Sequence, residues 1–143
     1  MSSGVTVAEE VLDAFQDIKL KHKHRYVIFR LSPDLTKIVV EERADKDKTY
    51  QDFVQKLQEA AENQQCRYGV FDVEYKHNDM NRQKLAFFLW SPENATVKQK
   101  MIYTSSKSCL KTKLQGIGVE IQATDDSELE QSVLLEKCRD KSQ

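Results

Sequence analysis

The sequence predicts a single-domain α/β fold in which a central mixed sheet of about five strands is flanked by helices on both faces. Segments with strand and helix patterns alternate along the chain, and several strand segments are apolar throughout, which requires burial on both faces. A length of 143 residues suits one domain better than two. We therefore expect residues 1–143 to form one domain, with a flexible N-terminus of about 5 residues.

The first half of the chain predicts a helix, a hairpin and a second helix. Apolar residues recur with helical spacing from Val7 onward, so we expect a helix at residues 8–20. β-Branched and aromatic runs predict strands at residues 25–31 and 37–42, and the Ser-Pro-Asp sequence between them favours a turn. Thr49 is a suitable N-cap for the second helix.

The second half predicts a central hairpin, a long helix, a strand and a last helix. Strand patterns occur at residues 67–75 and 84–90, and the polar stretch "KHNDMNRQ" is expected to be the loop between them. A helix capped by Thr96 is expected over residues 96–114. Residues 119–123 predict a further strand, and residues 125–140 a C-terminal helix.

Charge and composition argue against several classes of protein. The 22 basic and 23 acidic residues give a formal net charge of −1, so nucleic acid and anionic membranes are not expected partners of the whole chain. No apolar run of about 18 residues and no signal-peptide pattern is present, so we expect a cytoplasmic protein. The three cysteines are far apart in sequence, which favours reduced thiols over a metal site.

Motifs of common enzymes are also missing. None of the four glycines builds a nucleotide-binding loop, and no serine, cysteine or aspartate lies in a recognisable nucleophile motif. His22 and His24 could share a strand face as metal ligands, but the lysines and arginine around them favour a solvated basic patch. We expect no enzymatic activity, no cofactor and no metal.

The long helix carries an unusual charge pattern, because residues 96–113 contain five lysines and no acid. At 100° per residue, Lys100, Lys107 and Lys111 form a ridge, and Val97 and Met101 point away from the core. The expected buried arc comprises Ile102, Tyr103, Ser106, Cys109, Leu110 and Leu114. A lysine-rich face is often only a solvated surface. Exposed apolar residues beside cations instead favour a contact surface for an acidic partner: a protein, a phosphoinositide headgroup or nucleic acid.

Four segments resemble the actin-depolymerising factor/cofilin family: "SGVTV", "CRYGVFDVEY", "LWSPENATVKQKMIYTSSK" and "GVEIQATD". Their order and separations match over essentially the whole chain. The resemblance implies the actin-depolymerising-factor homology fold. It further implies a monomeric, non-enzymatic protein that binds actin monomers and filaments, prefers ADP-actin, and severs and depolymerises filaments. Phosphoinositide headgroups are a further partner to consider.

The resemblance also implies two sets of site residues. The contacts shared by actin monomers and filaments would be Ser3, Gly4, Val5, Lys98, Lys100, Met101, Lys107 and Lys111. The filament-specific contacts would be Arg82, Lys84, Glu136 and Lys137. Ser3 matches the family's regulatory phosphorylation site. Ile102 is left out of the site, because its position on the helix points inward.

The chain departs from the family pattern at a few positions. Asn81, Thr112 and Asp140 stand where bases are common, and Ser108 stands where an acid is frequent. These changes put the strength of severing in question, so the alternative function is a mainly monomer-binding or weakly severing, phosphoinositide-regulated variant. The expected location is the cytoplasm and cytoskeleton. The nucleus is a weaker alternative suggested by "KLKHKHR".

Overall fold

The computed structural model describes residues 4–141 and contains a six-stranded mixed sheet with strand order β1-β3-β2-β4-β5-β6. The strands are β1 Thr6–Val7, β2 His24–Leu31, β3 Lys37–Asp45, β4 Arg67–His77, β5 Met80–Trp90 and β6 Val119–Ala123. The helices are α1 Glu9–Lys19, α2 Tyr50–Glu62, α3 Val97–Lys113 and α4 Gln131–Asp140. Strands β2 to β5 pair antiparallel, whereas the outer pairs β1–β3 and β5–β6 are parallel.

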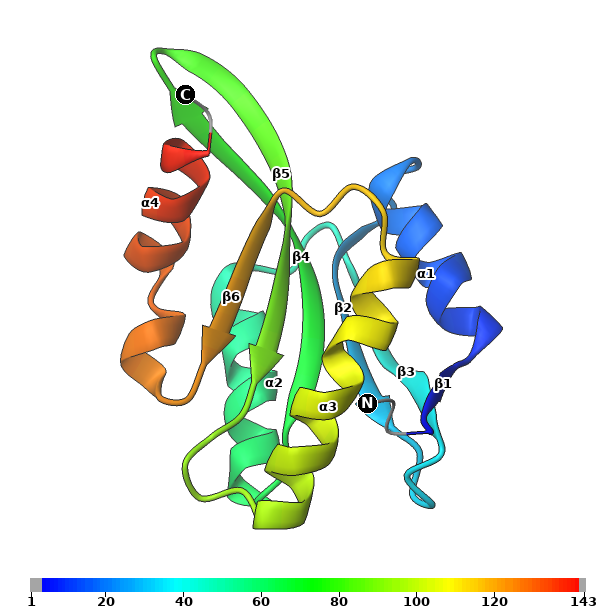
Figure 1. Cartoon of the computed structure of the whole chain (residues 1–143). Helices are drawn as coiled ribbons and strands as arrows, with labels where there is room; N and C mark the ends of the chain where they lie inside the picture. The colour runs from blue at the N-terminus through cyan, green and yellow to red at the C-terminus, as the bar shows by residue number, and fades with distance from the viewer. Residues whose placement is uncertain (1–3, 142–143) are drawn as a thin grey trace.

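Helices cover both faces of this sheet, as expected (Figure 1). Helices α1 and α3 pack on one face in a cluster that includes Phe15 and Phe87, and α2 and α4 pack on the other with Phe53 and Phe88. The adjacent β5 residues Phe87 and Phe88 therefore serve opposite cores, as the alternation of side chains along a strand requires. This explains why the central strands are apolar throughout.

The predicted helices and strands are confirmed in order, and the sheet contains one strand more than expected, β1. Val7, with which we expected the helical pattern of the first helix to begin, lies in β1 and pairs with Ile38 of β3. The helix begins at Glu9 instead, because Ala8 is extended and its N–H donates to the Ile38 carbonyl at 3.0 Å. Residues 1–3 of the expected flexible N-terminus lie outside the described residues, and Val5 is buried.

The prediction of a loop at residues 76–83 of the central hairpin is wrong, because β4 and β5 continue through most of this stretch. The strands stay paired from Arg67↔Trp90 to His77↔Met80, which leaves a two-residue turn. Asn78 and Asp79 form this turn with φ of 53° and 63°. Both residue types tolerate the left-handed conformation, and two successive positive φ values match the twist of a hairpin.

The C-terminal helix is also shorter than expected. A 3₁₀ turn at Asp126–Leu129 precedes α4, and Glu130 between them is extended with ψ of 141°. The Asp125 side chain accepts a hydrogen bond from the Glu128 N–H at 3.1 Å and so caps the 3₁₀ turn. The first residues of the helix expected over 125–140 therefore belong to this separate turn, and α4 begins only at Gln131.

His24 at the start of β2 gives a prediction about pH. Its two ring nitrogens are buried and make no hydrogen bond with the described residues. Burial lowers the pKa of His24 below its ordinary value of 6.5. The charges of Arg43 and Lys23 also lower this pKa, whereas the carboxylates of Asp17 and Asp45 raise it. The unfolded chain therefore binds this proton more readily, and stability falls as pH drops through 6.5 toward the folded-state pKa.

Urea unfolding at about pH 7.5 and about pH 5.5 measures this contribution. His24→Leu, which has a similar side-chain volume and cannot be protonated, should lose less stability between these pH values than the wild type. An equal loss in both proteins would contradict the prediction.

Candidate functional site

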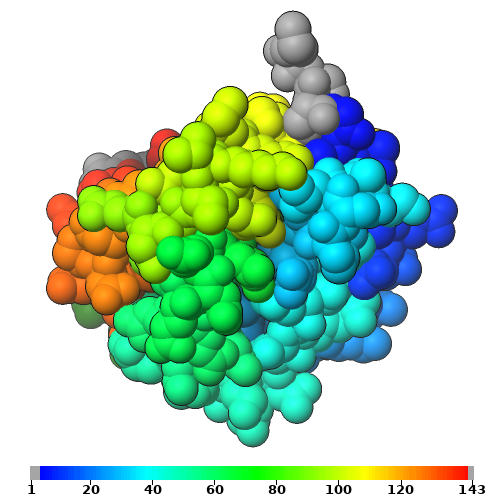
Figure 2. All heavy atoms as spheres, turned by 90° about the horizontal axis from the view of Figure 1, so that it is seen from below, coloured from blue at the N-terminus to red at the C-terminus, as the bar shows by residue number. Residues whose placement is uncertain are grey.

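Helix α3 presents an apolar hollow at the surface, lined by Val97, Lys98, Met101, Ile102 and Ser105. Val97 is 72% exposed and Met101 66%, which confirms that both point away from the core. Figure 2 shows the first turns of α3, in yellow-green, at the surface beside the end of α2 and the β2–β3 turn. Exposed large apolar side chains that cluster in this way are typical of a contact site.

Ile102 belongs to this hollow, although the helical positions placed it toward the core. It packs partly against the core cluster of α1 and α3 but is only half-buried. A residue at the border between the buried and exposed arcs of a helix can pack against the core and also line the surface. A helical projection assigns such residues to one side, so it could not reveal this contribution.

The two lysines in the first turn of α3 differ in their surroundings. Lys98 is exposed and forms no ion pair with any residue between 4 and 141. Lys100 is half-buried, and its Nζ donates to the Glu93 carbonyl at 2.7 Å. Lys98 is thus the cation beside the hollow that is free to meet an acidic partner.

Lys107 and Lys111 both form an ion pair with Glu120, an acid of β6. Lys107 Nζ lies 2.9 Å from Glu120 Oε1, and Lys111 Nζ is in close contact with Glu120 Oε2. Hydrogen bonding from Lys111, followed by that from Lys107, lowers the pKa of Glu120. Glu120 lies in β6, seven residues beyond the acid-free stretch 96–113, so only the tertiary fold reveals these ion pairs.

The chain start lies against the same helix. Val5 is buried, and Cys109 Sγ of α3 lies 3.6 Å from the Val5 carbonyl. Gly4 is exposed with φ of 81°, a conformation that favours glycine. Ser3 lies outside the described residues. Val5, with Gly4 beside it in sequence, thus lies next to the helix that carries the hollow.

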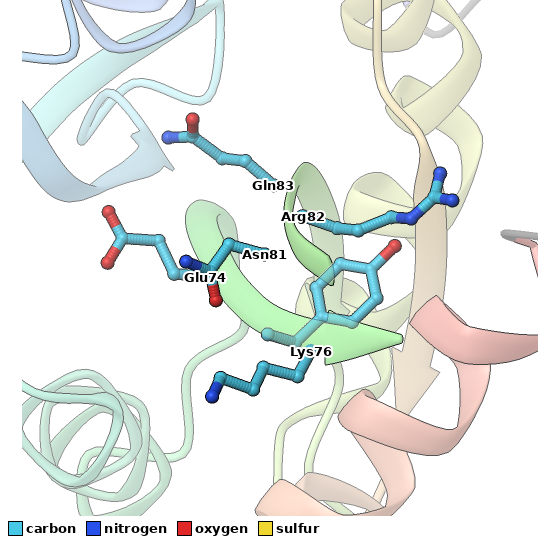
Figure 3. Close-up of a pocket in the computed structure, with 6 residues that line it drawn as sticks. Glu74, Lys76, Asn81, Arg82 and Gln83 are labelled. Carbon is cyan, nitrogen blue, oxygen red and sulfur yellow. The ribbon is translucent and has the colours of Figure 1, made fainter. Parts of the chain in front are cut away.

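The residues that we expect to contact filaments alone lie on α4 and on the outer part of the central hairpin, of which residues 75–82 form what we call the arm. Arg82 pairs with Tyr75 and Lys84 with Val73, so both cations are on the sheet face that α4 covers. Figure 3 shows Arg82 pointing to one side of the hairpin, and Glu74 and Gln83 to the other.

A partner could reach all four of the residues expected to contact filaments alone. Arg82 is exposed and Lys84 is half-buried. Glu136 and Lys137 are exposed on α4, next to the buried Cys138. The structure therefore places the four residues on one side of the molecule, on two elements that pack together.

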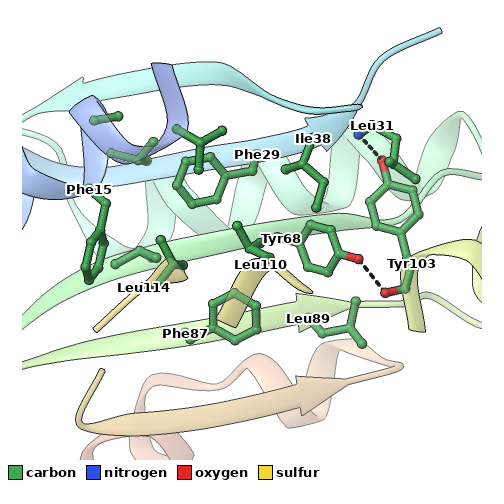
Figure 4. Packing of buried hydrophobic residues seen from close by; sticks show 14 of the residues in the cluster. Phe15, Phe29, Leu31, Ile38, Tyr68, Phe87, Leu89, Tyr103, Leu110 and Leu114 are labelled. Atoms are coloured by element: carbon green, nitrogen blue, oxygen red, sulfur yellow. Dashed lines mark hydrogen bonds between the residues drawn. The ribbon is translucent and has the colours of Figure 1, made fainter. Parts of the chain in front are cut away.

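Buried tyrosines hold α3 in place on the sheet (Figure 4). The Leu31 N–H of β2 donates to the Tyr103 hydroxyl at 2.9 Å, and the Tyr68 hydroxyl of β4 donates to the Tyr103 carbonyl. Burial raises the pKa of both tyrosines, so they stay protonated. Thr96 caps the helix as expected and accepts from the Gln99 N–H at 3.2 Å. The hollow is thus presented by a fixed helix.

Among residues 4–141, no helix is long and apolar enough to cross a membrane. The same residues contain no group of three or more histidines, cysteines and acids placed to hold a metal ion. The site consists of exposed apolar and charged side chains suited to a macromolecular partner.

Comparison with known proteins matches residues 4–139 to the family described as cofilin/tropomyosin-type actin-binding protein. Actophorin of Entamoeba histolytica is 39% identical over 137 residues, which cover 96% of each chain. The crystal structure of Streptomyces griseoflavus cofilin has a TM-score of 0.85 at 41% identity, covering 94% of this chain and 97% of that one. Plasmodium berghei actin depolymerization factor 2 has a TM-score of 0.82 at 30% identity, covering 96% and 99%.

Proposed function

The chain belongs to the actin-depolymerising factor/cofilin family, and from this premise we propose that it binds actin monomers and filaments, prefers ADP-actin, and severs and depolymerises filaments. As a family member it is an actin-binding protein that acts in actin turnover, not an enzyme. We expect it to act in the cytoplasm and on the cytoskeleton.

The observation that carries the proposal is the hollow on α3. Val97 and Met101 supply exposed apolar area, and Lys98 beside them has no ion-pair partner among the described residues. An apolar centre flanked by a cation suits a partner that offers an apolar pocket with acids at its rim. The arm and α4 supply a second surface, which suits a second actin subunit in a filament.

The test is to follow single filaments by light microscopy while this protein is added at several ratios to actin. The proposal predicts more breaks per filament length and faster loss of polymer, together with binding to fluorescent ADP-actin monomers. Unchanged filaments and no monomer binding would contradict it.

A second candidate function is a mainly monomer-binding, phosphoinositide-regulated variant that severs weakly. The two-residue turn at Asn78 and Asp79 supports it, because such a tight turn leaves no loop at the tip of the hairpin to contact a filament. Asn81 adds no charge there. Co-sedimentation separates the two candidates: filament binding as tight as monomer binding would exclude the second.

Phosphorylation of Ser3 is expected to weaken actin binding. Ser3 is followed in sequence by Gly4 and Val5, and the Val5 carbonyl lies 3.6 Å from Cys109 Sγ of α3. About two added negative charges in this N-terminal segment would oppose an acidic partner that binds α3. Ser3→Glu should weaken monomer binding by about 10-fold, measured by fluorescence titration, whereas Ser3→Ala, which changes the same residue without adding a charge, serves as the control. Equal affinities for Ser3→Glu and the wild type would exclude this switch.

A further inference from the structure

The outer part of the central hairpin extends beyond the neighbouring strands. The pairing of β2 with β4 covers only Tyr68 to Phe71, and that of β6 with β5 covers Ala86 to Trp90. This outer part is the arm, residues 75–82. A two-stranded hairpin alone is marginally stable in water, so the position of the arm depends on what packs against it.

On one side of the arm, the side-chain contacts within residues 4–141 lie at its base. Glu74 Oε2 lies 3.6 Å from Arg25 NH1, and the Gln83 amide donates to the buried Asp72 carboxylate at 2.6 Å. Both residues lie on the sheet face opposite to Arg82, as the strand register requires. These contacts fix where the arm leaves the sheet but do not reach its outer half.

On the other side, two consecutive residues of β4 bond to two consecutive residues of α4. The Tyr75 hydroxyl donates to the Cys138 carbonyl at 3.3 Å, and Arg139 Nε donates to the Lys76 carbonyl at 3.3 Å. Tyr75 is 7% exposed and Cys138 is fully buried, so the first bond is shielded from water. Arg139 closes the same junction from its exposed side.

This junction lies between the two halves of the filament-specific set. Arg82 is directly opposite Tyr75 in the hairpin register, and Glu136 and Lys137 immediately precede Cys138 on α4. A change in the angle between arm and helix would therefore move the two pairs of side chains relative to each other. A contact surface that is fixed before binding loses less conformational entropy when the partner binds.

We propose that Arg139 is a positioning residue, which together with Tyr75 fixes the arm against α4 and so holds Arg82 and Lys84 in register with Glu136 and Lys137. Arg139 acts through the Lys76 carbonyl and not through contact with actin. The role of this junction in binding rests on the proposed filament activity. The junction itself is a property of the free protein.

The experiment measures hydrogen exchange of residues 74–82 in the free protein, and filament affinity by co-sedimentation, for three variants. Arg139→Ala removes the exposed bond, and Tyr75→Phe removes the buried bond without any change of charge. Lys141→Ala is the matched control, because it removes the same charge from the same end of α4 and leaves both bonds intact. Thermal melting checks that each variant is folded.

We expect Arg139→Ala and Tyr75→Phe each to raise exchange in the arm by about fivefold and to weaken filament binding by a similar factor, as the loss of one net hydrogen bond implies. Lys141→Ala should leave exchange unchanged, and all three should bind monomers like the wild type. Weaker filament binding by Arg139→Ala with unchanged exchange would show a direct actin contact and overturn the proposal. Unchanged exchange in both Arg139→Ala and Tyr75→Phe would overturn it as well. If the wild type bound no filaments, the proposed function would fail, and exchange would still decide whether the junction holds the arm.

Discussion

Met101→Asp is expected to weaken binding to actin monomers and filaments by about 100-fold or more, because it places an unpaired charge at the centre of the α3 hollow. Met101 is 66% exposed, so the fold should tolerate the change. In a complex the aspartate would be desolvated against apolar groups. A cost of about 2.8 kcal/mol corresponds to 100-fold.

Gln51→Asp is the control for this variant. It introduces the same charge at an exposed position in the first turn of α2, at the end of that helix opposite to the one that lies beside the hollow. Fluorescence titration with monomers and co-sedimentation with filaments should show a large loss only for Met101→Asp. Equal losses in the two variants would mean that general repulsion, and not the hollow, determines binding.

Gly69→Ala is expected to lower the free energy of unfolding by about 2 kcal/mol, because it overpacks the core beneath α2. A Cβ at Gly69 would lie 2.7 Å from two ring atoms of Phe53. The Phe53 ring is fully buried and is enclosed by Phe88 at 4.9 Å and Tyr26 at 5.2 Å between ring centroids. The ring cannot move aside without displacing its neighbours.

Urea unfolding measures this effect, and Gly118→Ala serves as its control. The three atoms nearest to a Cβ at Gly118 belong to the Lys84 side chain and lie 3.3 to 3.4 Å away, so a shift of a few tenths of an ångström would relieve the contact. Its cost should stay within about 0.5 kcal/mol. Phe53→Leu in the Gly69→Ala background should recover part of the loss, because the two sites share the same space. Additive losses in the double variant would contradict the overpacking argument.

Much of the fold could be predicted from local signals. The caps Thr49 and Thr96 accept hydrogen bonds from Asp52 and Gln99, and both helices begin at the next residue. The outward direction of Val97 and Met101 followed from helical geometry alone. Such features depend on residues within a few positions of each other, which the sequence displays directly.

The features that were missed depend on partners remote in sequence. Strand β1 has two residues and exists because it pairs with β3, so it has no periodicity of its own. The arm is solvated at its outer end, so its polar residues resemble a loop although they are paired. Glu120 reaches Lys107 and Lys111 only after β6 packs beside α3. Ile102 was assigned to the core because a helical projection has no partly buried class.

We propose that one surface on α3 serves monomers and filaments, whereas a second surface on the arm and α4 serves filaments alone. Co-sedimentation and monomer titration of Arg82→Ala combined with Lys84→Ala test whether the two surfaces act separately. Arg82 is exposed and Lys84 is half-buried at the sheet margin, so the variant should fold. We predict that filament binding falls by about 10-fold or more while monomer affinity stays within about twofold. An equal loss of filament binding and monomer binding would show that the two surfaces are not separate and would contradict this division of the site.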